Sequence, residues 1–270
     1  MPRSLLWPDP RVKPPFGAAE IDWGHPLAQG LIGSFLCNEQ GGNPINGADG
    51  LPLVGVGTRS YLTTADGPAV QSLAGGSANG WDSADSTTYL APTLLTVVAR
   101  VIPSSTTASS IVSRGSLPYS YYLGWDLVSG SRFGFYLDMV AGDAWLYGTS
   151  SVVLGSPATV SGVWDGTTKS FYVNGRLEAT ATPTGPISYG SHHFHLCGRA
   201  DHGLGEDLRG TLVYASVYDR AVLAHEHLQL HYEPYAMLRP IVRRRYFVPA
   251  DAAAGWEQLL SHRRNRLVLT

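Results

Sequence analysis

Long apolar runs and cysteines are scarce in this sequence, and each scarcity excludes a class of protein. No stretch of 18 apolar residues occurs in the 270 residues, so no membrane-spanning helix is predicted. Residues 1–8 lack an adequate apolar core for a signal peptide, which predicts a protein made and matured in a cytoplasm. Cys37 and Cys197 are the two cysteines. Each is expected as a buried thiol in a strand, and a disulfide between them is left open.

Common catalytic motifs are also missing. The sequence contains no Gly-x-Ser-x-Gly elbow, no His-Glu-x-x-His motif and no phosphate-binding loop. The patterns that most directly identify serine hydrolases, zinc proteases and nucleotide-binding proteins therefore give no support for an enzyme.

Glycine and proline are abundant instead, and they separate short apolar runs. The chain has 31 Gly and 18 Pro with 44% apolar residues, and a helical pattern occurs only near the end. This profile is typical of an all-β protein with many turns. The clearest strands lie in residues 158–180, where alternating runs are interrupted by Asp165-Gly166 and Asn174-Gly175. These dipeptides favour tight hairpins, so three consecutive antiparallel strands are predicted.

Three stretches, in order and spacing, resemble a known family. They are V-W-D-G and F-Y-V-N-G within residues 163–175, G-L-I-G-S-F-L-C-N-E at 30–39, and L-V-Y-A-S-V-Y-D-R-A-V-L at 212–223. Together they resemble laminin-G-like domains of the concanavalin A-like group over residues 30–232. The resemblance implies a two-sheet antiparallel jelly-roll sandwich with one short C-terminal helix at 223–232. Ala224 and His227 occupy the positions of the family's Ser-x-x-Glu capping box, so this helix is expected to lack that cap.

The two ends of the chain differ from its centre. We predict an extended Pro-rich arm at 1–29, the jelly-roll domain at 30–232 and an Arg-rich docking tail at 233–270. Residues 1–232 hold 12 basic and 18 acidic residues, a net charge of −6, whereas residues 233–270 hold seven Arg and three acidic residues, a net charge of +4. This is a weak basic footprint for nucleic acid, and the alternation of arginines with apolar residues suits addition to another protein's sheet edge. The predicted docking residues are Arg239, Ile241, Arg243, Arg244, Arg245, Tyr246, Phe247 and Trp256.

Two further stretches resemble one subgroup of this family. The entry at 25–33 and the exit at 232–240 look like laminin-G-like proteins encoded in tailed bacteriophages. This resemblance implies a non-enzymatic structural protein of the virion, made in the host bacterial cytoplasm. A capsid decoration or accessory protein is expected, with the major capsid protein as its partner, and homo-oligomerisation is left open.

The alternative hypothesis is a glycan-binding adhesion module on the phage particle. Sugars stack on aromatic rings and are oriented by Asp or Asn side chains. The segment P-Y-S-Y-Y-L-G-W-D at 118–126 is rich in both. The candidate glycan-binding residues are Tyr119, Tyr121, Trp125 and Asp126, and Trp145 with Tyr147 forms a further aromatic pair.

Hydrolysis is the third hypothesis. Glucanases of the concanavalin A-like group carry a Glu-x-Asp-x-x-Glu strand, and alternation brings its two catalytic carboxylates to one sheet face. Here the pattern reduces to Glu20-Ile21-Asp22, with His25 in place of the final acid and prolines on both sides. We therefore predict that the protein is not an enzyme.

Two histidine groups have spacings that metal sites use. His193, His195 and Cys197 share one face of a predicted strand, and His227 and His231 share one face of the predicted helix. Solvent-facing side chains are the simpler interpretation, because a metal site would need the two groups to meet in space.

Calcium binding is a theme of the resembled family. Asp201, Glu206 and Asp207 in one polar loop are the candidate ligands, because Ca²⁺ prefers several carboxylate and carbonyl oxygens. Val213 and Tyr214 stand where the family's closing strand usually has an Asp-Glu pair. No cofactor is therefore required by the sequence.

Overall fold

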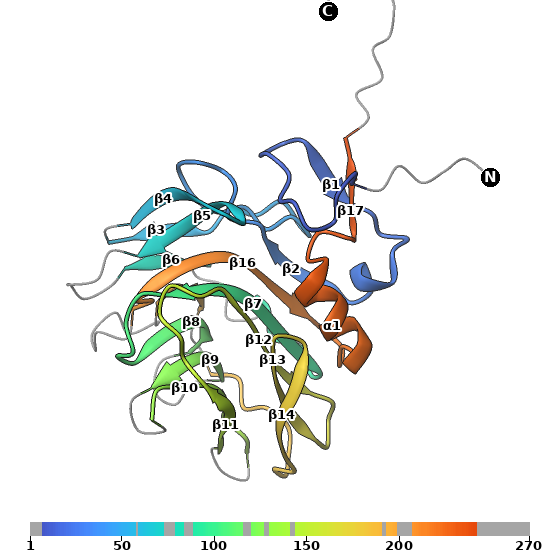
Figure 1. Cartoon of the computed structure of the whole chain (residues 1–270). Coiled ribbons are helices and arrows are strands. Elements are labelled where there is room, and N and C mark those ends of the chain that lie inside the picture. Colours follow the sequence, from blue (N-terminus) through green and yellow to red (C-terminus); the bar gives the residue numbers. More distant parts are fainter. Residues whose placement is uncertain are drawn as a thin grey trace, which may run out of the picture. The chain divides into compact units, whose positions relative to one another are not determined.

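The computed structural model is a sandwich of two antiparallel sheets (Figure 1). The structure describes residues 7–57, 59–72, 79–83, 89–115, 120–126, 130–140, 144–190, 193–198 and 207–241. The chain divides into a unit of residues 1–240 and a unit of residues 241–270, and Ile241 is the described residue of the second. None of the helices in the described ranges is long and apolar enough to cross a membrane.

The first sheet has seven strands within the described residues. In spatial order they are β11 (Ala144–Ser151), β10 (Arg132–Leu137), β9 (Tyr121–Asp126), β8 (Ser109–Arg114), β15 (Phe194–Leu196), β6 (Gly80–Asp82) and β3 (Val54–Val56).

The second sheet has eight strands in the same described part of the chain. Seven of them lie in the order β14 (Arg176–Ala181), β13 (Lys169–Val173), β12 (Ala158–Trp164), β7 (Leu95–Pro103), β16 (Gly210–Tyr218), β5 (Gly67–Ser72) and β4 (Arg59–Thr64), and β2 (Leu31–Phe35) also pairs with β16. Strands distant in sequence are neighbours in both sheets. This arrangement confirms the predicted two-sheet jelly roll.

The predicted three-stranded meander is β12, β13 and β14. Tyr172 pairs with Ser161 on the neighbouring strand that also carries Trp164, as expected. The second turn uses Asn174 and Gly175, whose φ angles of 51° and 75° are the left-handed values that a tight primed turn requires.

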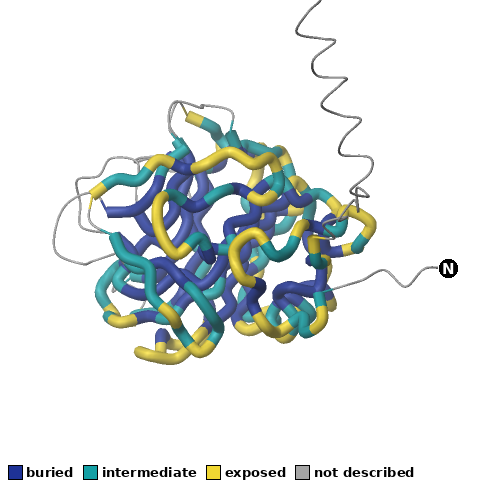
Figure 2. Tube along the Cα trace, turned by 90° about the horizontal axis from the view of Figure 1, so that it is seen from above, coloured by how far each residue is buried: buried dark blue, intermediate teal, exposed yellow. Residues whose placement is uncertain are grey.

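The core lies between the sheets, and Figure 2 shows the buried part of the trace enclosed by exposed loops. Inward side chains alternate along β12, where Val160 and Trp164 are buried in the main cluster. Gly162 lies between them because Phe135 from the other sheet occupies its space. A Cβ at this position would come within 2.1 Å of the Phe135 ring. The close approach of the sheets at this point therefore depends on a glycine.

The short helix α1 (Ala224–Tyr232) covers β12 and β13 of the eight-stranded sheet. His227 Nδ1 lies 3.0 Å from Ser161 Oγ, and its ring stacks on Tyr172 at 4.0 Å. The helix was expected to lack a capping box, but one of the two hydrogen bonds of such a box is present. Glu226 accepts the Leu223 backbone N–H at 2.7 Å, which is one half of a capping box, whereas Leu223 has no side-chain acceptor for the other half. The two capping-box positions were predicted at Ala224 and His227, and they lie one residue earlier, at Leu223 and Glu226.

The N-terminal arm belongs to the fold. β1 (Ala19–Ile21) pairs with β17 (Leu238–Pro240), and the two strands lie side by side in Figure 1. The arm was predicted as an extended segment, and in residues 19–21 it forms a regular antiparallel ladder. Lys13 also enters the interior, where its Nζ donates to the backbone oxygens of Pro68 and Val213. Burial lowers the pKa of Lys13 to about 8.

Residues 235–238 complete a second buried cluster with the arm and with β16. Tyr235, Met237 and Leu238 are each at most 2% exposed, and this cluster also contains Leu27 and Tyr218. The sandwich therefore extends to Pro240, and the domain boundary that we placed after residue 232 is corrected. The buried side chains in this segment are inward-facing core residues of the same domain.

Candidate functional site

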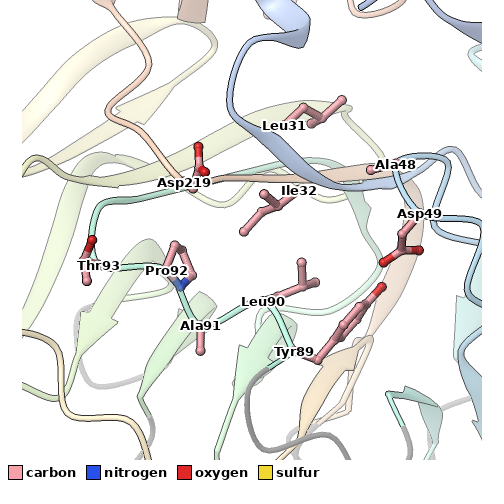
Figure 3. A pocket seen from close by; sticks show the side chains of 10 residues that line it. All are labelled: Leu31, Ile32, Ala48, Asp49, Tyr89, Leu90, Ala91, Pro92, Thr93 and Asp219. Carbon is pink, nitrogen blue, oxygen red and sulfur yellow. The ribbon is translucent and has the colours of Figure 1, made fainter.

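An open pocket of about 700 Å³ lies at the rim of the sandwich (Figure 3). We call it the rim pocket. Its wall comes from four separate parts of the chain, which are the start of β2, the turn at residues 46–50, the segment 89–93 before β7, and Asp219 after β16. Backbone hydrogen bonds tie the turn to β2, as from the Gly47 N–H to the Ser34 oxygen at 2.7 Å, and side-chain hydrogen bonds connect it to the segment 89–93.

Asn46 supplies those bonds. Its side chain is fully buried, and its Oδ1 accepts from the backbone N–H of Ser34 at 2.7 Å and of Ala48 at 3.0 Å. Its Nδ2 donates to the backbone oxygen of Ile32 at 3.0 Å and to the hydroxyl of Tyr89 at 2.8 Å. One amide therefore holds β2, the turn and the segment 89–93 together, and every hydrogen-bonding position of that amide is used.

Tyr89 forms a fixed part of the wall. Its hydroxyl accepts a hydrogen bond from Asn46 at 2.8 Å and faces the carboxylate of Asp49 (Figure 3). Its ring packs edge-on against Phe194, with centroids 6.3 Å apart. Burial raises the pKa of the Tyr89 hydroxyl, so the phenol stays protonated and keeps its proton for donation.

Asp219 lies on the opposite side of the pocket from Asp49 (Figure 3). Its backbone N–H donates to the oxygen of Gly30 at 2.8 Å. Gly30 has a φ of 67°, and a Cβ there would come within 2.6 Å of the Asp219 carboxylate. The absence of a side chain at Gly30 therefore leaves the space that the Asp219 carboxylate occupies. Next to it, Arg220 binds Glu226 through both guanidinium nitrogens, at 2.6 and 2.8 Å.

This arrangement suits hydrogen bonding to a ligand with several polar groups. Two exposed carboxylates offer acceptors, and the buried side chains of Leu31 and Leu90 add apolar surface between them. In the part of the chain that the structure describes, no group of three or more His, Cys, Asp or Glu side chains could hold a metal ion.

Comparison with known proteins identifies the family. Residues 60–226 match the model of the concanavalin A-like lectin/glucanases superfamily, which is more than half of the chain. The chain belongs to this superfamily. No curated protein matches it.

Solved structures agree with this concanavalin A-like fold. Domain 4 of AbnA, an arabinanase from Geobacillus stearothermophilus solved with arabinotriose, has a TM-score of 0.54 at 14% identity, covering 79% of this chain and 99% of that domain. The binding domain of Paraclostridial Mosquitocidal Protein 1 has a TM-score of 0.55 at 10% identity, with 75% and 52% covered. A Trypanosoma rangeli sialidase has a TM-score of 0.53 at 18% identity, with 76% of this chain but 33% of the sialidase covered. These TM-scores, all above 0.5, support a shared fold.

The predicted glycan-binding aromatics of the concanavalin A-like domain are mostly unsuited to that role. Tyr121 and Trp125 are fully buried between the sheets, so no sugar can stack on them, and that prediction is corrected. The Tyr121 hydroxyl instead donates to the oxygen of Leu90 at 3.0 Å and supports the rim pocket from behind. Asp126 accepts a hydrogen bond from Tyr147. Tyr119 lies outside the described residues.

The aromatic pair Trp145 and Tyr147 lies on the edge strand β11. The two rings stack in parallel, with centroids 5.2 Å apart, and both are half-buried. Trp145 also packs against Tyr122 and Tyr136, which form a small cluster apart from the main core. These rings mainly cover the backbone around Gly134, where a Cβ would come within 2.7 Å of Tyr147.

The two histidine groups do not meet. His195 lies on β15 of the seven-stranded sheet, whereas His227 and His231 bond to Ser161 and Thr159 of the eight-stranded sheet. Cys197, like Cys37, is a buried free thiol.

Two of the three predicted calcium ligands, Asp201 and Glu206, lie outside the described residues. Asp207 is 7% exposed and accepts a hydrogen bond from Asn79 at 3.0 Å. Calcium binding by this loop stays a prediction.

Of the eight predicted docking residues, the structure describes Arg239 and Ile241. Arg239 pairs with Glu20 at 2.9 Å and lies 3.9 Å from Asp22, so this arginine is used within the domain. Ile241 is 38% exposed. The others lie outside the described residues; these are Arg243, Arg244, Arg245, Tyr246, Phe247 and Trp256.

Sequence analysis missed Asn46, Asp49, Tyr89 and Asp219 as site residues. The dipeptides Asn46-Gly47 and Asp49-Gly50 indicate turns, and that signal is correct, but it says nothing about which way a side chain points. The pairing of β2 with β16 brings Asp219 to this place, and the hydrogen bonds of Asn46 bring Tyr89 and the turn that carries Asp49.

Proposed function

We propose that this concanavalin A-like domain binds a glycan in the rim pocket and does not hydrolyse it. The observation that carries the proposal is the pocket wall, in which Asn46 holds Tyr89, the Tyr89 hydroxyl faces Asp49, and Asp219 lies on the opposite side of the pocket. A fixed wall loses little freedom on binding, and carboxylates accept hydrogen bonds from sugar hydroxyls. The fold supports the proposal, because the similar AbnA domain was solved with arabinotriose.

A binding role without hydrolysis agrees with the position of the acidic pair. Glu20 and Asp22 lie on the arm, where both face Arg239 rather than the rim pocket. We expect no release of reducing sugar from β-glucans or bacterial polysaccharides. Release that disappears in the variant Glu20→Gln would contradict this proposal.

A glycan array probed with the full chain tests binding. We expect specific sugars to be retained, and we expect Ala91→Tyr to abolish retention because Ala91 lines the pocket and a phenol ring would fill it. Ala18→Tyr adds the same ring to a half-buried alanine outside the pocket, and it should leave retention unchanged. Equal retention by both variants would place binding elsewhere and refute the pocket.

The role as a virion structural protein stays a prediction. We propose it as a second candidate because Ile241 is an exposed apolar residue directly before the Arg-rich segment that was predicted to dock. The test is incorporation into phage particles by the full chain and by a chain ending at residue 241. Equal incorporation of both chains would argue against docking through residues 242–270.

A further inference from the structure

The charged residues that line the rim pocket all have the same sign. Of the ten lining residues, Asp49 and Asp219 are charged, and both are exposed. No Lys, Arg or His is among the ten. A ligand in this pocket therefore meets two negative charges directly.

The nearby cations are already engaged. Arg220 is bound to Glu226 and also donates to the oxygen of Gln29 at 2.7 Å, so its guanidinium is directed at these partners, although its charge also acts on Asp219. Arg114 lies behind the wall, where it is fully buried, donates to the backbone oxygen of Tyr89 at 3.3 Å and faces the ring of Tyr189 at 4.8 Å. Neither guanidinium is among the groups that line the pocket.

The Asp49 carboxylate keeps capacity for a ligand. It accepts the Leu51 backbone N–H at 2.8 Å, and the Tyr89 hydroxyl faces it (Figure 3). A carboxylate has about four acceptor positions, so about two remain for a bound molecule even if that hydroxyl takes one. These positions can accept hydrogen bonds from an ammonium group or a hydroxyl, whereas a second carboxylate would be repelled.

We propose that the rim pocket prefers glycans that carry a free amino group, namely amino sugars that are not acetylated, and disfavours glycans that carry carboxylates. The inference rests on the proposed function. An ammonium group gives each exposed carboxylate a partner of opposite charge, and such exposed pairs strengthen binding by about 1.4- to 5-fold each. Calcium is a poorer match, because it needs about six to eight oxygens, more than two carboxylates supply.

The test compares three matched ligands by titration calorimetry with the full chain. They are a glucosamine tetrasaccharide, its fully N-acetylated form, and a tetrasaccharide of galacturonic acid. We expect the free amine to bind about 2- to 25-fold more tightly than the acetylated form, with the uronate weakest. The difference should shrink at high salt, which screens exposed charges.

Two variants assign the preference to the carboxylates. Asp49→Asn retains an oxygen for the Leu51 N–H, and Asp219→Asn keeps the shape of the side chain while it removes the charge and one acceptor oxygen, so both should fold and lose part of the preference for the amine. Asp9→Asn removes the same charge from the arm, outside the pocket, and should leave the preference intact. Far-ultraviolet circular dichroism verifies that each variant is folded.

The outcomes separate the inference from the function it rests on. If none of the three ligands binds, both the inference and the proposed function fail for these sugars. If the acetylated and free forms bind equally, or if the preference survives in both pocket variants, the charge inference is wrong while glycan binding stands.

Discussion

Replacement of Asn46 by alanine should destabilise the domain far more than a typical substitution. The side chain makes four hydrogen bonds, and three of its partners belong to β2 or to the segment 89–93. Loss of the amide leaves the buried N–H of Ser34 without its acceptor, which costs about 1–3 kcal/mol, and each of the other bonds contributes about 0.5–1.5 kcal/mol. The backbone N–H of Ala48 is half-exposed and can bond to water instead. The expected loss of stability is therefore about 2–6 kcal/mol.

Asn38→Ala is the matched control. Asn38 is also buried, at 4% exposure, but its amide makes one described bond, a donation to the oxygen of Pro14 at 2.8 Å. We expect this variant to lose about 1–2 kcal/mol. Urea denaturation of the two variants and the parent chain measures both losses, provided that the slope of each transition is unchanged. If Asn46→Ala is no less stable than Asn38→Ala, Asn46 does not organise the rim pocket.

Three further predictions follow from the packing. A chain of residues 1–232 should unfold or aggregate, whereas a chain of residues 1–241 should fold. The shorter chain loses several buried side chains, and each of them contributes about 2–5 kcal/mol to stability. Equal thermal midpoints of the two chains would contradict this prediction. Burial lowers the pKa of His227 to about 4, so stability should be complete above about pH 6.5 and fall by about 3 kcal/mol as pH decreases to 4, and His227→Gln should remove that slope in urea titrations. Gly175→Ala should cost at least about 1 kcal/mol more than Gly155→Ala, since both glycines have positive φ but only the first would place a Cβ 2.7 Å from helix α1; equal costs would refute the contact.

Local patterns predicted the strands well. The alternation in residues 158–180 and the Asn174-Gly175 turn depend on neighbours in sequence, and both appear as expected. The buried faces were harder to predict. Both faces of β9 carry aromatic rings, with Tyr121 and Trp125 on one and Tyr122 on the other, so the pattern alone does not say which face is covered.

Long-range pairing was outside the reach of sequence patterns. Arg239 between apolar residues looks like an exposed docking strand, but its partner is Glu20, 219 residues earlier in the chain. Likewise, Asn46 looks like an ordinary turn residue until β2 and Tyr89 are placed around it. A single sequence shows the preference of each segment and leaves its distant partner unspecified.

The pairing of β1 with β17 has a consequence for synthesis. A ribosome adds about 5–20 residues per second, so the 219 residues between Glu20 and Arg239 take about 10–45 seconds to make. Throughout that interval the emerging arm has no strand to pair with, and Lys13 must wait for Val213 before its ammonium group finds both of its acceptors. The first strand of the chain is therefore among the last to be placed, and a chaperone that binds extended Pro-rich segments would have its opportunity during those seconds.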